Sequence, residues 1–332
     1  MNSKNKFVRI IGTGSYLPEK VVTNFDMEKI LDTTDDWIYT RVGIRERRII
    51  DDEDTTSDLA ARAAKKALED ANVDVLDIDL IIVATSSPDM IQPSTACVVQ
   101  RKIGAWNAAA FDISAVCSGF VYALSIGADL LMSNSYKKAL IIGAEAYSRI
   151  LDWSDRTSCV FFGDGAGAVV VSTDDKEKGI LGSYLMADGR GYEIITMPAG
   201  GAKLPASYET VRNNQHAFRM DGKKIWDFVV DIFPKVVAKT LEKSGLTIND
   251  VDFIISHQAN VNLIREGMKS IGLPMSKTHT TIEKYGNTSG ASVSITLDDA
   301  LKSGKINNGD TVILVAFGGG LTWGGIALRW NK

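Results

Sequence analysis

The sequence predicts an α/β protein whose chain folds into two similar halves. Short apolar runs typical of buried strands alternate with segments of helical period. The order of these segments repeats at an offset of 173 residues, so that the run at Leu80 matches the run at Phe253. Near-continuous apolar strands are typical of sheets that helices cover on both faces. We therefore expect one half at residues 1–175 and a second at residues 176–332.

Each half is expected to run in one order: strand, helix, buried strand, helix, buried strand and glycine-rich turn. The segments that carry this order are helices at residues 56–72 and 228–245, later buried runs at Leu140 and Ile313, and turns at residues 162–167 and 317–320. The two turns lie 155 residues apart, so the register slips toward the ends of the halves. The alternative is chance similarity among common α/β patterns, and it is disfavoured because several segments share one gapless offset.

Composition narrows the class of function. A formal net charge of −4 over 332 residues argues against a general nucleic-acid binder. No apolar run is long enough to span a bilayer, and residues 1–9 lack the apolar segment of a signal peptide. The three cysteines are unpaired in spacing and odd in number, which favours free thiols in a reducing compartment. We therefore expect a cytoplasmic protein with no membrane or nucleic-acid partner.

Cys117 is a candidate nucleophile. It precedes the small and apolar run Ser118-Gly119-Phe120, which is typical of the start of a buried helix. The positive end of a helix and its unpaired N–H groups favour the thiolate, which is the nucleophilic form. The alternative is a buried, inert cysteine, since free cysteine is among the most buried residue types. For Cys97 and Cys159 this alternative is preferred.

His257 and Asn287 are the candidate partners of Cys117. His257 follows the apolar run at Phe253, and Asn287 lies in a segment that the 173-residue offset places on the Cys117 segment. Side chains at strand ends meet at one edge of an α/β sheet, so the three are expected to be neighbours. A cysteine with a histidine and an asparagine is a candidate set for covalent catalysis. Alone, the histidine is equally well structural and the asparagine a turn residue.

The three residue types do not choose the reaction. A cysteine protease, an amide hydrolase and a condensing enzyme all use such a set. A hydrolase needs an accessible water molecule, whereas a condensing enzyme must exclude water and stabilise a carbanion. These residues therefore leave all three kinds of enzyme open.

A family resemblance extends over nearly the whole chain. The segments VCSGF (116–120), ILDWSDR (150–156), FGDGAG (162–167), HQAN (257–260), YGNTS (285–289) and FGGGLTWG (317–324) resemble, in order, the motifs of β-ketoacyl-acyl carrier protein synthase III. Residues 12–18 and 36–47 match its opening. The resemblance implies the thiolase-like fold, five layers αβαβα built from two duplicated halves. It also implies a homodimer.

The resemblance further implies an acyltransferase that initiates fatty acid synthesis. The activity is a decarboxylative Claisen condensation of an acyl-CoA primer with malonyl-acyl carrier protein. By this resemblance Cys117 carries the acyl group, the N–H groups of Cys117 and Gly319 form the oxyanion hole, and His257 and Asn287 stabilise the enolate. It implies no metal and no permanently bound cofactor, since acyl-CoA is a substrate.

The binding residues are likewise carried over from the family. Those that contact CoA are expected to be Thr33, Trp37, Arg41, Arg156 and Asn260, with the adenine between Trp37 and Arg156. Those that line the pantetheine and acyl tunnel are expected to be Phe162, Trp226, Phe317 and, across a dimer, Gln92. The alternatives are core packing for the aromatic residues and a surface ion pair for Arg41.

The chain departs from the family at two positions. Asn262 stands where the family usually has an arginine associated with carrier-protein docking, and Gly290 stands where it tends to have alanine. Arg265 and Lys269 are spaced i,i+4 and offer a substitute docking patch.

Other functions compete with initiation of fatty acid synthesis. One is a related ketosynthase or acyltransferase of a specialised-product, polyketide-type pathway. A degradative thiolase is disfavoured because no cysteine follows Cys159. An inactive CoA-binding subunit is disfavoured by the intact Cys117, His257 and Asn287.

Overall fold

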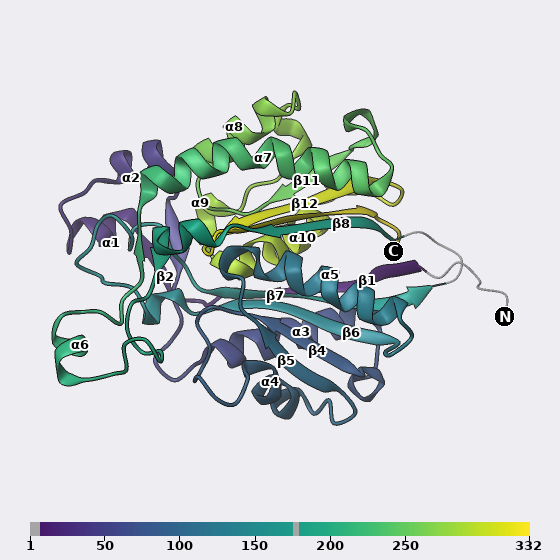
Figure 1. Ribbon diagram of the computed structural model, residues 1–332, viewed down its shortest axis with the longest axis horizontal. Helices are drawn as coiled ribbons and strands as arrows, with labels where there is room; N and C mark the ends of the chain where they lie inside the picture. Colours follow the sequence, from purple (N-terminus) through teal and green to yellow (C-terminus); the bar gives the residue numbers. More distant parts are fainter. Residues whose placement is uncertain (1–6, 175–178) are drawn as a thin grey trace.

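The computed structural model describes residues 7–174 and 179–332, and the expected boundary between residues 175 and 176 lies outside the described residues. The described chain forms five layers: outer helices, a sheet, a middle pair of helices, a second sheet and further outer helices (Figure 1). The predicted αβαβα fold class is therefore confirmed. Within the described ranges no helix combines the length and the apolar character needed to cross a membrane.

The two sheets share one strand order. The first sheet runs β1 (Phe7–Tyr16), β7 (Gly165–Asp174), β6 (Lys138–Glu145), β4 (Leu80–Ala84) and β5 (Ala109–Ile113). The second runs, in the matching direction, β8 (Ile180–Ala187), β13 (Thr322–Arg329), β12 (Thr311–Gly318) and β11 (Phe253–Ser256). In both sheets the first two pairs are antiparallel and the third is parallel. The repeat in the sequence is thus a repeat of sheet topology.

The halves differ at the edge beyond β4 and β11. In the first sheet β5 pairs with β4 over five residues. At the corresponding edge of the second sheet a single parallel bridge joins Ile254 to Thr278. In the described part of the second half, this one bridge therefore stands where the first half has its fifth strand.

Helices occupy equivalent places in the two halves. Those on the outer faces are α3 (Thr56–Ala71) and α4 (Thr95–Ile103) on the first sheet, and α7 (Gly222–Ser244) and α8 (Val261–Ser270) on the second. Those between the sheets are α5 (Gly119–Met132) and α10 (Ser292–Lys302). The predicted helix at 228–245 starts earlier than expected because the Asp221 side chain accepts a hydrogen bond from the Lys224 N–H and caps it.

The middle layer holds the two halves together. Phe120 and Leu124 of α5, and Val293 and Leu297 of α10, are all fully buried in one apolar cluster with strands of both sheets. Burying such side chains is worth roughly 1.5–3 kcal/mol each. Because both helices are buried over most of their length, their first residues are fixed between the sheets.

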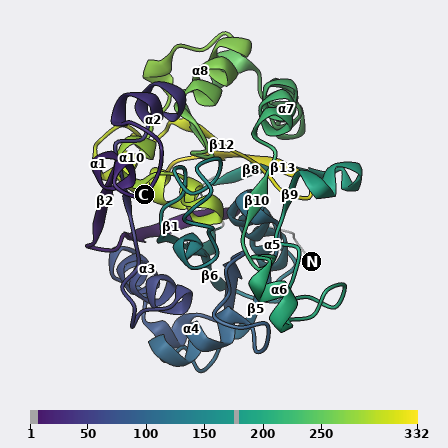
Figure 2. The same cartoon turned by 90° about the vertical axis from the view of Figure 1, so that its left-hand side faces the viewer.

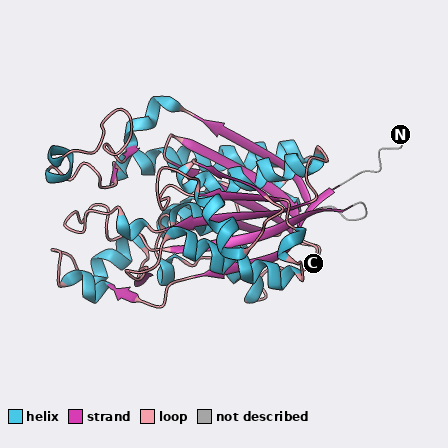
Figure 3. Ribbon diagram, turned by 90° about the horizontal axis from the view of Figure 1, so that it is seen from below, coloured by secondary structure: helices cyan, strands magenta, loops and turns pink. Residues whose placement is uncertain are grey.

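The shorter elements gather at the end of the molecule opposite the C-terminus (Figures 1, 2 and 3). They are β2 (Val21–Thr23), α1 (Asn24–Glu28), α2 (Asp35–Val42), β3 (Glu46–Arg48), β9 (Ile195–Thr196), α6 (Tyr208–Arg212), β10 (Arg219–Met220) and α9 (Ile282–Tyr285). The fully buried Arg47 joins β2 and α1 to Val160, because its guanidinium donates to Val22 O, to Asn24 Oδ1 and to Val160 O.

The halves approach closely where β6 meets the start of α10. A Cβ added to Gly143 would lie 2.6 Å from Gly290 O and 3.0 Å from Ala291 Cα. We predict that Gly143→Ala lowers the free energy of unfolding by about 1–3 kcal/mol, because backbone must shift to admit the methyl group.

Urea denaturation measures this loss. The matched control is Gly189→Ala, whose added Cβ would meet nothing within 4 Å. Equal stabilities for the two variants would show that the halves are not closely packed at this point.

Candidate active site

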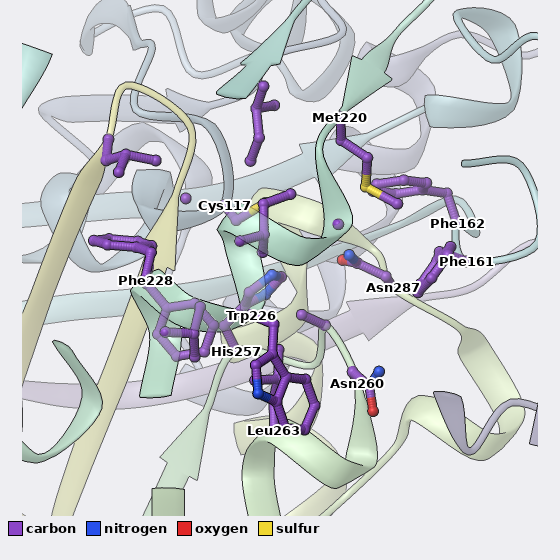
Figure 4. Close-up of a pocket in the computed structure, with 18 of the residues that line it drawn as sticks. Cys117, Phe161, Phe162, Met220, Trp226, Phe228, His257, Asn260, Leu263 and Asn287 are labelled. Carbon is purple, nitrogen blue, oxygen red and sulfur yellow. The ribbon is translucent and has the colours of Figure 1, made fainter. Parts of the chain in front are cut away.

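One cavity lies between the two halves and brings together the three predicted catalytic residues. Cys117, His257 and Asn287 all line it, and the rest of its wall is mainly apolar and aromatic (Figure 4). Its volume is about 120 Å³. The expectation that the three residues are neighbours is therefore met in one cavity, although they lie far apart along the chain.

Cys117 is held by a sharp turn at the start of α5. The turn is the short 3-10 helix η2 (Val116–Ser118), and Val116 adopts a φ of 45°. A β-branched residue rarely takes a positive φ, so the conformation is imposed by the surrounding packing. The 3-10 helix η7 (Ser289–Ala291) enters α10 in the same way, with a φ of 45° at Ser289. Val116 and Ser289 are separated by the 173-residue offset of the repeat.

The Cys117 sulfur is buried and protonated at rest. Its residue is 7% exposed, and its Sγ lies 3.3 Å from Ser289 Oγ. Burial raises the pKa of the thiol to about 12, and the nearby Glu145 charge acts in the same direction. Desolvation therefore outweighs the effect of the helix terminus, which by itself favours the thiolate. A nucleophilic role for this sulfur requires the loss of its proton.

His257 follows β11 and is a neutral hydrogen-bond donor. Burial lowers its pKa to about 3, so the ring is uncharged near neutral pH. Its Nδ1 lies 2.6 Å from Ser292 Oγ, and that oxygen also accepts the Gln258 N–H at 3.3 Å. The Ser292 hydroxyl can donate to Nδ1, and in the tautomer that accepts this bond the ring proton lies on Nε2.

Asn287 is oriented by its backbone and by its neighbour. Its N–H donates to Phe161 O at 2.8 Å, and its side-chain oxygen accepts the Ser289 N–H at 2.8 Å. Because the acceptor oxygen is engaged, the side-chain NH₂ group is the part that is free to donate into the cavity. His257 and Asn287 therefore both present N–H donors.

The predicted oxyanion-hole residues lie on adjoining turns. Gly319 is buried just after β12, and a Cβ on the preceding Gly318 would lie only 2.7 Å from the Cys117 N atom. The glycine-rich turn is therefore packed directly on the backbone of the candidate nucleophile. The assignment of the Gly319 N–H to an oxyanion stays a prediction.

Three of the four predicted tunnel residues line the cavity: Phe162, Trp226 and Phe317. Gln92 is exposed and is not part of its wall, and its assignment across a dimer is untested. The sequence analysis missed several apolar wall residues, namely Ile195, Phe218, Met220, Ile225, Phe228, Val229, Leu263 and Leu321. Ile225, Phe228 and Val229 are spaced i, i+3, i+4 on α7, which predicts that they share one buried face of the helix. That spacing does not distinguish a cavity wall from ordinary core packing.

The predicted CoA residues lie beside the cavity on α2 and its surroundings. The Arg156 guanidinium stands 5.1 Å from the Trp37 ring centroid. Asn260 lines the cavity and also donates to Arg41 O at 3.0 Å, which joins the cavity to the end of α2. Thr33 has a buried hydroxyl with no hydrogen-bond partner in the described chain.

The departure at Asn262 has a structural explanation. Its side-chain NH₂ donates to Thr40 O and Arg41 O at 3.1 Å each and so caps the last turn of α2. Its side-chain oxygen accepts from Arg265 at 2.7 Å. Arg265 and Lys269 are both exposed on α8, as the i,i+4 spacing predicts.

In the described ranges, no group of three or more His, Cys, Asp or Glu side chains is placed to hold a metal ion. The donors that do converge on the cavity are N–H groups and one thiol.

Comparisons with known proteins agree with this site. A model of the 3-oxoacyl-[acyl-carrier-protein] synthase III family matches residues 111–189, and a model of its C-terminal part matches residues 241–330. A β-ketoacyl-[acyl-carrier-protein] synthase III of Caldanaerobacter subterraneus is 53% identical over 97% of this chain and 98% of its own length. A protein of the same name from Clostridioides difficile is 49% identical, with both chains covered completely.

Solved structures show the same likeness. The 3-oxoacyl-[acyl-carrier-protein] synthase III of Aquifex aeolicus is 44% identical and superposes with a TM-score of 0.91, over 97% of this chain and 100% of its own. The priming β-ketosynthase of the R1128 polyketide pathway is 35% identical, with a TM-score of 0.91 over 98% and 97%.

The layered fold and the cysteine cavity define a thiolase-like condensing enzyme, a class of acyltransferase. Relatives that share about half of their residues over nearly the whole length narrow that class. The chain belongs to the β-ketoacyl-[acyl-carrier-protein] synthase III family.

The depressed pKa of His257 predicts a loss of stability in acid. Between pH 6.5 and pH 3 the unfolded chain binds a proton that the folded ring refuses, so the free energy of unfolding falls as pH falls through this window. The His257→Gln variant lacks this contribution. We expect its stability to fall less than that of the unaltered protein between pH 7 and pH 5, by about 2 kcal/mol at most.

Urea denaturation at the two pH values measures the difference. Parallel losses in both proteins would mean that the folded ring takes up the proton.

Proposed function

We propose that this enzyme joins an acyl-CoA primer to malonyl-acyl carrier protein by decarboxylative Claisen condensation and so initiates fatty acid synthesis. The observation that carries the proposal is the convergence of one thiol and two N–H donors, from Cys117, His257 and Asn287, in one mainly apolar cavity. The thiol can accept the acyl group, and the N–H donors can stabilise the negative charge that develops during condensation. Apolar walls disfavour hydrolysis of the thioester.

The first half-reaction loads Cys117. Its sulfur attacks the thioester carbonyl of acyl-CoA, a new carbon–sulfur bond forms, and the bond to the CoA sulfur breaks. The CoA thiolate leaves and takes up a proton. Cys117 has therefore lost one thiol proton and CoA has gained one. The N–H groups of Cys117 and Gly319 are assigned to the oxyanion of the tetrahedral intermediate, where the loss of one donor costs roughly 3–4 kcal/mol.

The second half-reaction makes the carbon–carbon bond. The malonyl thioester loses CO₂, and the electrons of the broken bond move toward its carbonyl oxygen. His257 Nε2–H and the Asn287 NH₂ group donate to that oxygen, since both point into the cavity. The resulting carbanion attacks the carbonyl carbon of acyl-Cys117, so that a carbon–carbon bond forms and the carbon–sulfur bond breaks. Cys117 leaves as a thiolate and takes up a proton, and the product is a β-ketoacyl thioester. A neutral ring suits this role because it donates without protonating the carbanion.

The binding assignments follow the same layout. Trp37 and Arg156 are assigned to the CoA adenine, Arg41 to its phosphates, and Thr33 and Asn260 to the neighbouring part of CoA. Arginine suits both tasks because it is planar and permanently charged. Phe162, Trp226 and Phe317 are assigned to the pantetheine and acyl tunnel, and Gln92 to the primer pocket of a homodimer. A cytoplasmic location and the absence of a resident cofactor complete the proposal.

A specialised-product pathway is the second candidate. It is favoured by the likeness to the priming β-ketosynthase of a polyketide pathway, which is 35% identical over 98% of this chain. Product analysis with acetyl-, isobutyryl- and longer acyl-CoAs, each followed by malonyl-acyl carrier protein, distinguishes the two by the primer used.

Substitution of the catalytic residues separates the half-reactions. Cys117→Ala is expected to abolish transfer of radiolabelled acyl groups from CoA to the protein. His257→Ala is expected to leave this acylation largely intact and to lower malonyl decarboxylation by about 10²-fold or more. Label retained on the Cys117→Ala protein would overturn the nucleophile, and equal loss of both steps would make His257 a base for the thiol.

Charge reversal tests the proposed carrier-protein patch. The double variant Arg265→Glu, Lys269→Glu is expected to raise KM for malonyl-acyl carrier protein about tenfold, because exposed cations steer an acidic partner. The matched control reverses Lys235 and Lys239, which are exposed at i,i+4 spacing on α7. Unchanged KM in the first variant, measured with saturating acyl-CoA, would remove the patch from the docking surface.

A further inference from the structure

One buried hydroxyl group contacts the nucleophile and has no part in the reaction described above. Ser289 is fully buried, and its Oγ lies 3.3 Å from the Cys117 Sγ, in a hydrogen bond for which either group can be the donor. Ser289 is not one of the residues that line the cavity, so it contacts the sulfur from outside the cavity wall. A hydroxyl group in this place can accept a hydrogen bond from the resting thiol and can donate one to a thiolate.

The backbone at Ser289 favours glycine over serine. Its φ of 45° lies in the left-handed region, where a Cβ costs energy. The equivalent residue of the first half is Val116, which has the same φ and no hydroxyl group, so the turn itself does not require one. A strained residue whose side chain the turn does not need is a candidate for a functional role. The contact with Cys117 indicates where that role lies.

The side chain and the backbone of Ser289 contact different members of the site. The hydroxyl group contacts Cys117, whereas the Ser289 N–H donates to Asn287 Oδ1 at 2.8 Å. That backbone bond orients the side chain assigned to the second half-reaction. A substitution that changes only the side chain of Ser289 therefore keeps the bond to Asn287, so the two contacts can be tested separately.

We propose that Ser289 is a catalytic residue, whose hydroxyl group donates a hydrogen bond to the Cys117 sulfur whenever that sulfur carries negative charge. This happens twice in the reaction: when the thiolate attacks acyl-CoA, and when Cys117 leaves as a thiolate in the condensation. No covalent bond to Ser289 forms or breaks, and its proton stays on the oxygen. The role in these two steps rests on the proposed function.

The surroundings of Cys117 oppose a negative charge on its sulfur. Burial raises the pKa of the thiol to about 12, the Ser289 hydrogen bond lowers it, and the Glu145 charge raises it. The other titratable groups near the sulfur are Tyr147, whose pKa burial holds well above its ordinary value, and His257, whose pKa burial lowers to about 3. None of these three neighbours is a cation near neutral pH. A hydrogen bond from an uncharged hydroxyl group therefore stabilises a thiolate more strongly here than in water.

The first experiment measures single-turnover acylation by radiolabelled acetyl-CoA in Ser289→Gly and Ser289→Ala. Both variants lack the hydroxyl group, and glycine adopts the positive φ without strain. Both are expected to show a maximal rate about ten- to hundredfold lower, which is the range for loss of one hydrogen bond to a charged group, at an unchanged half-saturating concentration of acetyl-CoA. A normal rate in Ser289→Gly would show that only the backbone conformation matters and would overturn the proposal.

The matched control is Ser294→Ala, which removes another fully buried hydroxyl group from the same part of the chain. Ser294 lies on α10, donates to Ala291 O at 2.9 Å and is not one of the residues that line the cavity. Its acylation rate is expected to equal that of the unaltered protein. A loss as large as that in Ser289→Gly would contradict a specific role for Ser289, because any buried hydroxyl group nearby would then matter equally.

The second experiment measures release of CO₂ from malonyl-acyl carrier protein by Ser289→Gly that has been acylated to completion. The acylated sulfur carries no negative charge when CO₂ is lost, and the Ser289 N–H still orients Asn287. Release of CO₂ is therefore expected at the rate of the unaltered protein. An equal fall in acylation and in CO₂ release would mean that the residue supports the site as a whole, and would refute its role as a donor to the sulfur.

Alkylation of Cys117 by iodoacetamide at neutral pH tests the hydroxyl group without any CoA substrate, with the product located by mass spectrometry. The thiolate is the form that reacts, so Ser289→Gly is expected to be alkylated about ten- to hundredfold more slowly than the unaltered protein. Equal alkylation rates in the two proteins would overturn the proposal. If the unaltered protein takes up no acyl group from acetyl-CoA, the proposed function fails, while the alkylation rates still decide the role of Ser289.

Discussion

The close packing of two short turns, at the starts of α5 and α10, is the constraint on which the rest of this structure depends. Both turns carry a residue with a φ of 45°, Val116 in one and Ser289 in the other. Glycine lets a strand of the opposite half pack against each turn: Gly318 on Cys117, and Gly143 on Gly290. The apolar middle layer holds this arrangement, and the catalytic cavity forms along it.

The same scaffold serves two different purposes in the two halves. The repeat places Cys117 opposite Gly290, and Glu145 opposite Gly318. Beside Cys117 the glycine leaves space next to the Cys117 N–H, which a Cβ on Gly318 would fill. Around Gly290 a carboxylate accepts the corresponding N–H. The repeat also matches His257 with Ala84, so a histidine lines the cavity from one half only. The thiol of the cavity comes from the first half, and the His257 and Asn287 side chains come from the second.

Burial sets the protonation states on which the chemistry relies. It keeps His257 neutral, so that Ser292 can direct the ring proton to Nε2, and it keeps the resting Cys117 a thiol. The mainly apolar wall of the cavity provides the low-polarity surroundings that cause both shifts.

The sequence by itself determined the fold class, the repeat, and the membership of Cys117, His257 and Asn287 in one site. These follow from local periodicity and strand ends, which short segments encode. It did not predict the earlier start of α7, the apolar wall from α7, the cap that Asn262 places on α2, or the thiol state of Cys117. Only the tertiary structure decided these, because each depends on side chains brought together from distant parts of the chain. The desolvation of a side chain in particular depends on all the atoms packed around it, so it cannot be predicted from any single segment of the sequence.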